Sequence, residues 1–371
     1  MSISFKLMGA TCALAATFAA QAESSSVTIY GSIDQYLNYM TSSSGAKVKA
    51  LEDGALLRSR LGFRGTEDLG GGLAAKFQLE MGLSADTGTQ ADTTRSFDRQ
   101  AWVGLADSWG EVRLGRQNGP IFARGGYIDH NARTLGSMVN VFGTPSRYDN
   151  DLSYISPRVG DFQFEGHVSL PEVSGSSSSI VYQAAIDYIH GDYRAGYMTL
   201  HGRPLAGAPV NKDVVYDNLY FNWLYGKGTV YLAYVRSNNN TSNATSNNGT
   251  TILGNVGGLN AGTNADLNNF YVIKQVSADY RLSDQLRVGA LWGQIEDQSG
   301  RGRGANGGSI AAYYDFSKRT TVHAMVETIR NDTNGGWRPA GSAGLKTTFT
   351  SPVDINGRTI DGFHLGIVHR F

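Results

Sequence analysis

Polar and apolar residues alternate with a period of two along most of this chain. At its end, Phe363, Leu365 and Ile367 share one side of an extended segment. His364 and Arg370 share the other side. Such alternation is the pattern of a β-strand with one apolar and one polar face. The same period recurs in residues 27–34, 57–64, 73–81, 184–188, 214–225, 229–236, 270–282, 286–295 and 321–329. We therefore predict an all-β protein.

The connections between these segments alternate between short and long. Short turn clusters occupy residues 67–72, 106–110, 156–160, 225–228, 282–284 and 317–319. Longer polar segments occupy residues 40–55, 85–96, 118–146, 202–213, 238–264, 297–305 and 331–361. This rhythm is typical of an up-and-down antiparallel β-barrel with short turns on one rim and long loops on the other. About sixteen strands of roughly 9–11 residues fit the chain length.

The first residues have the pattern of an export signal. Lys6 provides a basic start, residues 7–20 are almost wholly apolar, and Ala20-Gln21-Ala22 is a small-x-small cleavage pattern. The alternative is a buried helix of a cytosolic protein, which these three signal elements disfavour. We predict a signal peptide over residues 1–22, cleaved after Ala22, and a single barrel domain over residues 23–371.

Composition excludes several classes of protein. The single cysteine, Cys12, lies inside the predicted signal, so the mature chain would have no disulfide, thiolate metal site or cysteine nucleophile. No uncharged apolar run of about 18 residues follows the signal, which argues against membrane helices. A transmembrane barrel fits the mean hydropathy of −0.26, because alternate residues face a wet lumen. A formal net charge of zero gives nucleic-acid binding no support.

Two other interpretations remain open at this point. Alternation alone also fits a soluble β-sandwich or solenoid, although the signal, the even spacing and aromatic residues at strand ends favour a membrane barrel. A barrel hydrolase would need a set such as Asp129 and His130 with a serine from another loop. The G-x-G-x-x-G match at residues 302–307 precedes a strand rather than a helix, so it does not indicate nucleotide binding. We predict no enzyme activity, cofactor or metal site.

Several motifs together resemble the general trimeric porins of Gram-negative outer membranes. They are residues 26–31 (SVTIYG), 60–70 (RLGFRGTEDLG), 97–105 (FDRQAWVGL), 110–117 (GEVRLGRQ) and the terminal 369–371 (HRF), the last two resembling the beta-proteobacterial branch. The resemblance implies a sixteen-stranded barrel, a homotrimer, and contact with outer-membrane lipid and lipopolysaccharide. It also implies passive diffusion of ions and small hydrophilic solutes, and a third external loop folded into the lumen. A solute-specific channel is the alternative within this class.

Arginines are the candidates for the pore wall. Leu61 and Phe63 share one strand face, so Arg58 and Arg60 share the other. An arginine facing lipid at mid-depth costs about 2–4 kcal/mol, which predicts that these arginines face the lumen. The resemblance implies that Arg60, Arg99 and Arg147 form the basic wall, with Arg58 and Lys76 as additions. It also implies that Trp102 and Gly104 face lipid, which would place Arg99 inward.

Residues 118–146 are the candidate for the constriction loop. This segment contains one acid, Asp129, together with Arg124 and Arg133. The resemblance implies that loop carboxylates face the wall arginines across the pore, which makes Asp129 the candidate acid. The alternative role of Asp129 is to cap a turn. The excess of basic residues predicts a weak-to-moderate preference for anions.

Overall fold

The computed structural model describes residues 26–170, 180–202, 213–238, 270–344 and 347–371. The predicted signal peptide and nearly all of the predicted loop 238–264 lie outside these residues. Within the described residues, no helix is long and apolar enough to cross a membrane.

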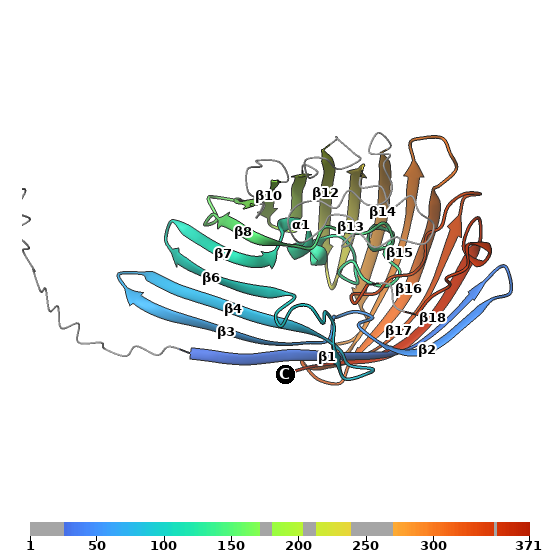
Figure 1. Cartoon of the computed structure of the whole chain (residues 1–371), viewed down its shortest axis with the longest axis horizontal. Coiled ribbons are helices and arrows are strands. Elements are labelled where there is room, and N and C mark those ends of the chain that lie inside the picture. The colour runs from blue at the N-terminus through green and yellow to red at the C-terminus, as the bar shows by residue number, and fades with distance from the viewer. Residues whose placement is uncertain (1–25, 171–179, 203–212, 239–269, 345–346) are drawn as a thin grey trace, which may run out of the picture.

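The described chain is almost entirely antiparallel sheet. Its strands are β1 (Ser26–Ser42), β2 (Lys47–Asp53), β3 (Arg60–Gly70), β4 (Leu73–Ser84), β5 (Thr89–Gln90), β6 (Gln100–Asp107), β7 (Gly110–Asn118), β8 (Arg147–Ile155), β9 (Phe162–Ser169), β10 (Val181–His190), β11 (Tyr193–Gly202), β12 (Val214–Tyr225), β13 (Gly228–Ser237), β14 (Tyr271–Arg281), β15 (Leu286–Asp297), β16 (Ala305–Asp315), β17 (Thr320–Asn331) and β18 (Thr359–Arg370). Consecutive strands lie side by side around the sheet, from the blue β1 to the red β18 (Figure 1).

The sheet closes on itself because β1 pairs with strands from both ends of the chain. Its first half pairs with β3 and its second half with β2, so these two strands act as one interrupted strand. Its other edge pairs with β18, from Ser32 with Arg370 to Ser42 with Ile360. The short β5 pairs with β4. The result is a closed 16-strand antiparallel barrel, which confirms the predicted fold class.

Alternate side chains face opposite sides of the wall, as the sequence pattern predicts. On β18, Phe363, Leu365 and Ile367 are 40–47% exposed on the outside, whereas His364 and Val368 are buried on the inside. Large exposed apolar side chains recur on most other strands. Such an extensive apolar surface suits contact with lipid rather than water.

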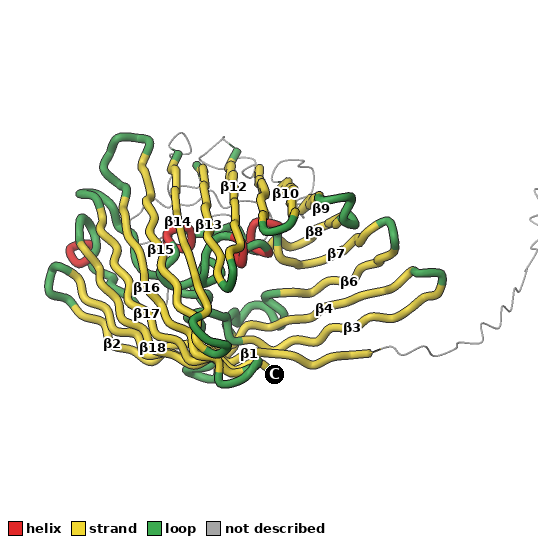
Figure 2. Tube along the Cα trace, turned by 180° about the vertical axis from the view of Figure 1, so that it is seen from behind, coloured by secondary structure: helices red, strands yellow, loops and turns green. Residues whose placement is uncertain are grey.

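The connections mostly follow the predicted rhythm, but residues 40–55, predicted as a long polar segment, contain the end of β1 and all of β2, which pair as a hairpin. One rim carries short turns, such as those between β10 and β11 and between β12 and β13. The other rim carries longer described connections, such as that between β15 and β16, which is drawn in green in Figure 2. Each predicted short turn cluster overlaps the connection between two consecutive strands, although residues 67–70 of the cluster 67–72 still belong to β3.

The predicted strand over residues 57–64 is wrong at its beginning. Residues 54–59 form a break between β2 and β3, and the strand starts only at Arg60. The Asp34 carboxylate accepts hydrogen bonds from the backbone N–H groups of Leu56 and Leu57, both at 2.7 Å. The Asp34 N–H donates to the Ser59 hydroxyl oxygen at 3.0 Å. Because Asp34 satisfies these groups from the neighbouring strand, the backbone can leave the sheet without unpaired donors.

Residues 119–146, hereafter the inner loop, contain three short helices: α1 (Pro120–Ala123), η1 (Gly125–Tyr127) and α2 (Met138–Phe142). A second 3-10 helix, η2 (Pro352–Asp354), lies outside this loop. The inner loop contacts strand residues on the buried face of the wall, since the Met138 N–H donates to Gln275 at 2.8 Å and the His130 N–H donates to Ser277 at 3.2 Å. It also supplies Ile121 and Phe142, both fully buried, to the main hydrophobic cluster. The loop therefore lies against the inside of the barrel.

Candidate functional site

Arg124 fixes the first half of the inner loop to the barrel wall. Its Nε lies 2.9 and 2.8 Å from the two carboxylate oxygens of Asp187 on β10, and its Nη1 lies 2.7 Å from Glu165 Oε2 on β9. Burial alone would lower the pKa of Arg124, but the hydrogen bonds and charges of these carboxylates outweigh it and raise that pKa. Arg124 is therefore a neutralised anchor rather than a free cation in the lumen.

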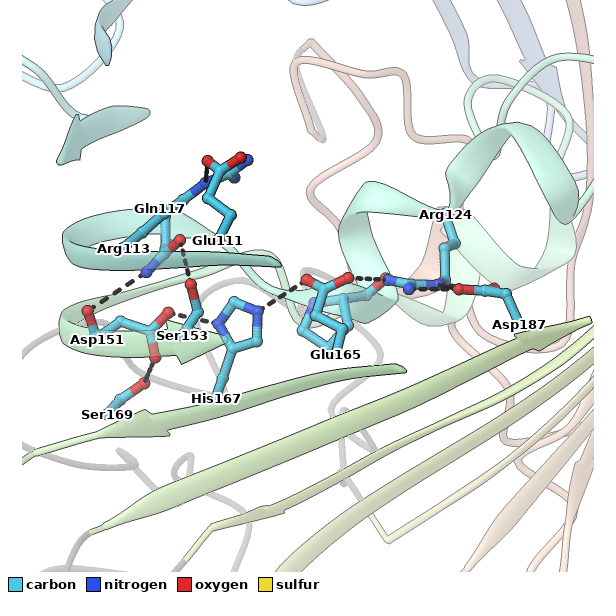
Figure 3. A network of polar contacts seen from close by, with 11 residues as sticks. Glu111, Arg113, Gln117, Arg124, Asp151, Ser153, Glu165, His167, Ser169 and Asp187 are labelled. Atoms are coloured by element: carbon cyan, nitrogen blue, oxygen red, sulfur yellow. Dashed lines mark hydrogen bonds and ion pairs between the residues drawn. The ribbon is translucent and has the colours of Figure 1, made fainter. Parts of the chain in front are cut away.

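The anchor continues into a buried polar network on the wall (Figure 3). His167 lies between two carboxylates, with Nε2 at 2.8 Å from Glu165 and Nδ1 at 2.6 Å from Asp151. The Ser169 hydroxyl donates to Asp151 at 2.8 Å. The network joins β8, β9 and β10 beneath α1, so the loop rests on a wall region whose charges are already paired.

Asp129 holds the turn of the inner loop together. Its carboxylate accepts hydrogen bonds from the Ser137 hydroxyl at 2.6 Å, the Arg133 N–H at 2.6 Å and the Gln275 amide at 2.8 Å. The side chain is 1% exposed, and this burial raises the pKa of Asp129. The geometry fits the turn-capping alternative, because no side of the carboxylate remains open to face the wall arginines.

His130 does not form the hydrolase pair that the sequence left open. Its ring nitrogen Nδ1 lies 3.1 Å from the Tyr313 hydroxyl, while the Asp129 carboxylate is occupied by other donors. Burial, together with the charge of Arg287, lowers the pKa of His130 to about 3. The imidazole is therefore neutral at pH 7 and belongs to the packing of the loop.

The Arg133 side chain donates hydrogen bonds to backbone carbonyl groups of α1. Its Nη1 and Nη2 donate to the carbonyl oxygens of Ile121 at 3.3 Å and Phe122 at 3.2 Å. Its guanidinium also lies 4.8 Å from the centroid of the Phe122 ring. These contacts fix Arg133 without neutralising it, since carbonyl groups carry no formal charge.

Arg60 and Arg99 share the carboxylate of Glu80 on β4, the strand that pairs with both β3 and β6. Arg99 Nε donates to Glu80 Oε1 at 2.6 Å, and Arg60 Nε lies 3.9 Å from Glu80 Oε2. The Tyr30 hydroxyl also donates to Glu80 at 2.9 Å. The Arg60 side chain is 26% exposed, whereas that of Arg99 is 7% exposed. Two cations on one carboxylate leave a net positive charge at this level of the wall.

Arg58 and Arg147 complete this group. Arg58 Nη1 donates to the Ala343 carbonyl at 2.6 Å. Arg147 begins β8, and its Nε and Nη2 have no hydrogen-bond partner among the described residues. Neither arginine forms an ion pair within the described part of the chain. We call Arg58, Arg60, Arg99 and Arg147 the wall arginines; the sequence-predicted members lie together, and Glu80 is the carboxylate that two of them share.

Lys76 belongs to a different part of the wall. Its Nζ lies 2.9 Å from Glu111 Oε2, and Glu111 also accepts from Arg113 Nε at 2.5 Å. Lys76 precedes Glu80 by four residues on β4, a separation of roughly 13 Å along a strand. It lies toward the rim of short turns, in a depression that it shares with Arg64 and Arg113. Lys76 is thus apart from the wall arginines.

The predicted orientation of Trp102 is wrong. Trp102 is 8% exposed and its indole N–H donates to Gln100 at 3.1 Å, whereas Val103 and Leu105 are 56% and 45% exposed on the outside. Strict alternation from Trp102 would then direct Arg99 outward. Arg99 nevertheless lies inside, because it precedes the first residue of β6 and its side chain turns to Glu80.

Sequence reasoning missed two residues of this region. Glu80 lies on the same face of its strand as Lys76, so alternation could have identified it as lumen-facing. Phe122 could not have been found in this way, because its contacts with Arg133 and Arg147 depend on how the loop folds. Among the described residues, no group of three or more His, Cys, Asp or Glu side chains could hold a metal ion.

Comparisons with known proteins agree with this architecture. The sequence model of the Gram-negative porin family matches residues 9–334. An outer membrane porin protein of Bordetella pertussis is 38% identical over 166 residues, which cover 39% of this chain and 43% of that protein. Outer membrane porin protein 32 of Delftia acidovorans is 25% identical over 99% of both chains.

A solved structure supports the fold at full length. The anion-selective porin from Comamonas acidovorans superimposes with a TM-score of 0.71 at 21% identity, covering 94% of this chain and 100% of that chain. Relatives and fold together indicate a β-barrel channel of the outer membrane rather than an enzyme. The chain belongs to the Gram-negative porin family.

Proposed function

We propose that this porin is a water-filled channel for passive diffusion of ions and small hydrophilic solutes, with a preference for anions set by the wall arginines. The observation that carries this proposal is the charge imbalance at one level of the lumen. Arg60 and Arg99 share Glu80, Arg58 and Arg147 have no ion pair among the described residues, and Asp129 is buried in its own turn. An anion passing this level meets more cations than carboxylates.

The expected preference is modest. Two unit charges 4 Å apart interact by about 1 kcal/mol in bulk water and by about 4 kcal/mol at an effective dielectric constant of 20. A hydrated lumen lies between these limits, so an excess of a few arginines favours anions by about 1–2 kcal/mol, or roughly tenfold in permeability. Weak binding also suits transport, because the anion has to leave again.

Reversal potentials across a salt gradient in planar bilayers test this proposal. We expect wild-type protein to prefer chloride over potassium, and Arg147→Gln to lower the permeability ratio by about three- to tenfold, because it removes a cation that no carboxylate neutralises. Lys76→Gln is the matched control, since it removes a cation from the separate group near Glu111. Cation preference in the wild type, or equal effects of the two substitutions, would contradict the proposal.

We also propose a homotrimer in contact with outer-membrane lipid and lipopolysaccharide. OmpT, an outer membrane protein of Vibrio cholerae whose structure has been solved in a trimer form, has the same fold with a TM-score of 0.63. The apolar outer face described above is the surface that lipid would cover. Conductance steps that occur in groups of three in the bilayer experiment support the trimer.

A further inference from the structure

Phe122 presents one aromatic ring to two cations. The Arg147 guanidinium lies 4.5 Å from the ring centroid, and the Arg133 guanidinium lies 4.8 Å from it. Both distances are within the range of a cation–π interaction, which draws a cation toward the electron-rich face of the ring. Arg147 belongs to the barrel wall and Arg133 to the inner loop, so the Phe122 ring contacts one cation from each.

The two guanidinium groups differ in what else holds them. Arg133 donates to two carbonyl oxygens of α1 and would keep its place without the ring. Arg147 is buried, with 8% of its surface exposed. Its Nε and Nη2 nevertheless have no hydrogen-bond partner, and it forms no ion pair, among the described residues. The remaining wall arginines have a carboxylate or a carbonyl oxygen as partner. The Phe122 ring is therefore the main contact that can orient the Arg147 guanidinium.

The local structure brings Phe122 to this place from the other end of the loop. The Gly119 N–H donates to the Ser146 carbonyl at 2.9 Å, which closes the base of the inner loop and sets α1 beside the start of β8. Pro120 begins α1, where its missing N–H is no loss. Ile121 points into the main hydrophobic cluster, whereas Phe122 is half-buried and is not part of that cluster. Packing in the hydrophobic core therefore does not explain why an aromatic side chain lies at this position.

We propose that Phe122 is a positioning residue for anion selection: its ring holds the Arg147 guanidinium, beside Arg133, so that the positive charge of Arg147, which forms no ion pair among the described residues, acts on a passing inorganic anion or small carboxylate. The ring also offsets part of the repulsion between the two cations, because both interact with its quadrupole. This inference rests on the proposed anion preference and names the residue that keeps the unneutralised wall cation in place.

The test compares reversal potentials of Phe122→Leu, Phe122→Tyr, Arg147→Gln and the double variant Phe122→Leu with Arg147→Gln. Phe122→Leu removes the π-face and retains an apolar side chain, so we expect the anion-to-cation permeability ratio to fall about two- to fivefold. Phe122→Tyr retains the ring and should behave as the wild type. In the double variant the leucine should have no further effect, because the cation that it displaces is already absent.

Three outcomes would overturn the inference. Phe122→Leu could leave the ratio unchanged while Arg147→Gln lowers it; the anion proposal would then stand and the positioning role would not. Equal losses in the leucine and tyrosine variants would show that a displaced loop, rather than the π-face, is responsible. An equal effect of the leucine in the presence and absence of Arg147 would show that Phe122 does not act through that cation. A wild type without anion preference would instead refute the proposed function itself. The migration of unheated samples on gels verifies that each variant assembles.

Discussion

Arg124→Met destabilises the folded barrel by about 3–5 kcal/mol, the usual result of removing one partner from a buried ion pair. The substitution leaves the carboxylates of Asp187 and Glu165 buried without their guanidinium. His167 and the Tyr220 hydroxyl still contact these carboxylates, so we expect a value near the lower end of this range. Urea unfolding in detergent measures the change, and single-channel recordings should show larger current fluctuations because α1 has lost its anchor.

Arg95→Met is the matched control for this prediction. Arg95 pairs with Asp92 and Asp149, but its side chain is 25% exposed and the pair is partly solvated. Ion pairs of this kind contribute only about 0–1 kcal/mol. Adding Asp187→Asn to Arg124→Met should recover part of the lost stability, since one uncompensated charge is removed. If Arg124→Met is no more destabilising than Arg95→Met, the anchor does not hold the loop.

Leu232→Arg destabilises the protein by about 2–4 kcal/mol, because it places a guanidinium on the lipid-facing side of β13. Leu232 is 46% exposed on the outside and lies near the middle of its strand, between Phe221 and Val276 on the neighbouring strands. All three residues have exposed apolar side chains. Urea unfolding of protein folded into lipid vesicles measures the cost.

Thr66→Arg provides the comparison on the other side of the wall. Thr66 is exposed and borders the lumen-facing depression around Lys76 and Arg64. An arginine there remains in water, so we expect a change within about 0.5 kcal/mol, as for most surface substitutions. Equal costs for the two arginines would mean that the outer face is not in contact with lipid.

The sequence was sufficient for the fold because a membrane barrel repeats one simple constraint. On β18 the alternation of Phe363, Leu365 and Ile367 with buried residues is the same in sequence and in structure. Turn residues marked the short connections for a similar reason, since Gly226 and Gly160 adopt the positive φ angles that such turns require. These features are local, so they can be read without knowing the tertiary structure.

The prediction failed where a long-range contact replaced the local rule. Asp34 holds Leu56 and Leu57 outside the sheet, although the pattern of residues 57–59 continues the strand that follows. Trp102 faces inward because Gln100 and Arg113 provide partners for its ring there. Alternation assigns faces only within a regular strand, and Arg99 precedes one.

The candidate site was predicted in part. Arg58, Arg60, Arg99 and Arg147 come together, but Lys76 lies apart, and Arg124 is paired with wall carboxylates. The role of Asp129 depended on how many donors the folded loop brings to it, which spacing does not show. Phe122 carries no signal in the sequence, since its importance comes from two arginines that approach it in space.

The most direct test of the arginine wall is the reversal potential of Arg147→Glu in planar bilayers, with Lys49→Glu as the control. Lys49 lies exposed on β2, with its side chain on the outer face, so the same change of charge there is screened from the lumen. We predict that Arg147→Glu lowers the anion-to-cation permeability ratio more than tenfold below that of the wild type, while Lys49→Glu leaves it unchanged. A ratio that stays at the wild-type value in Arg147→Glu would contradict the account.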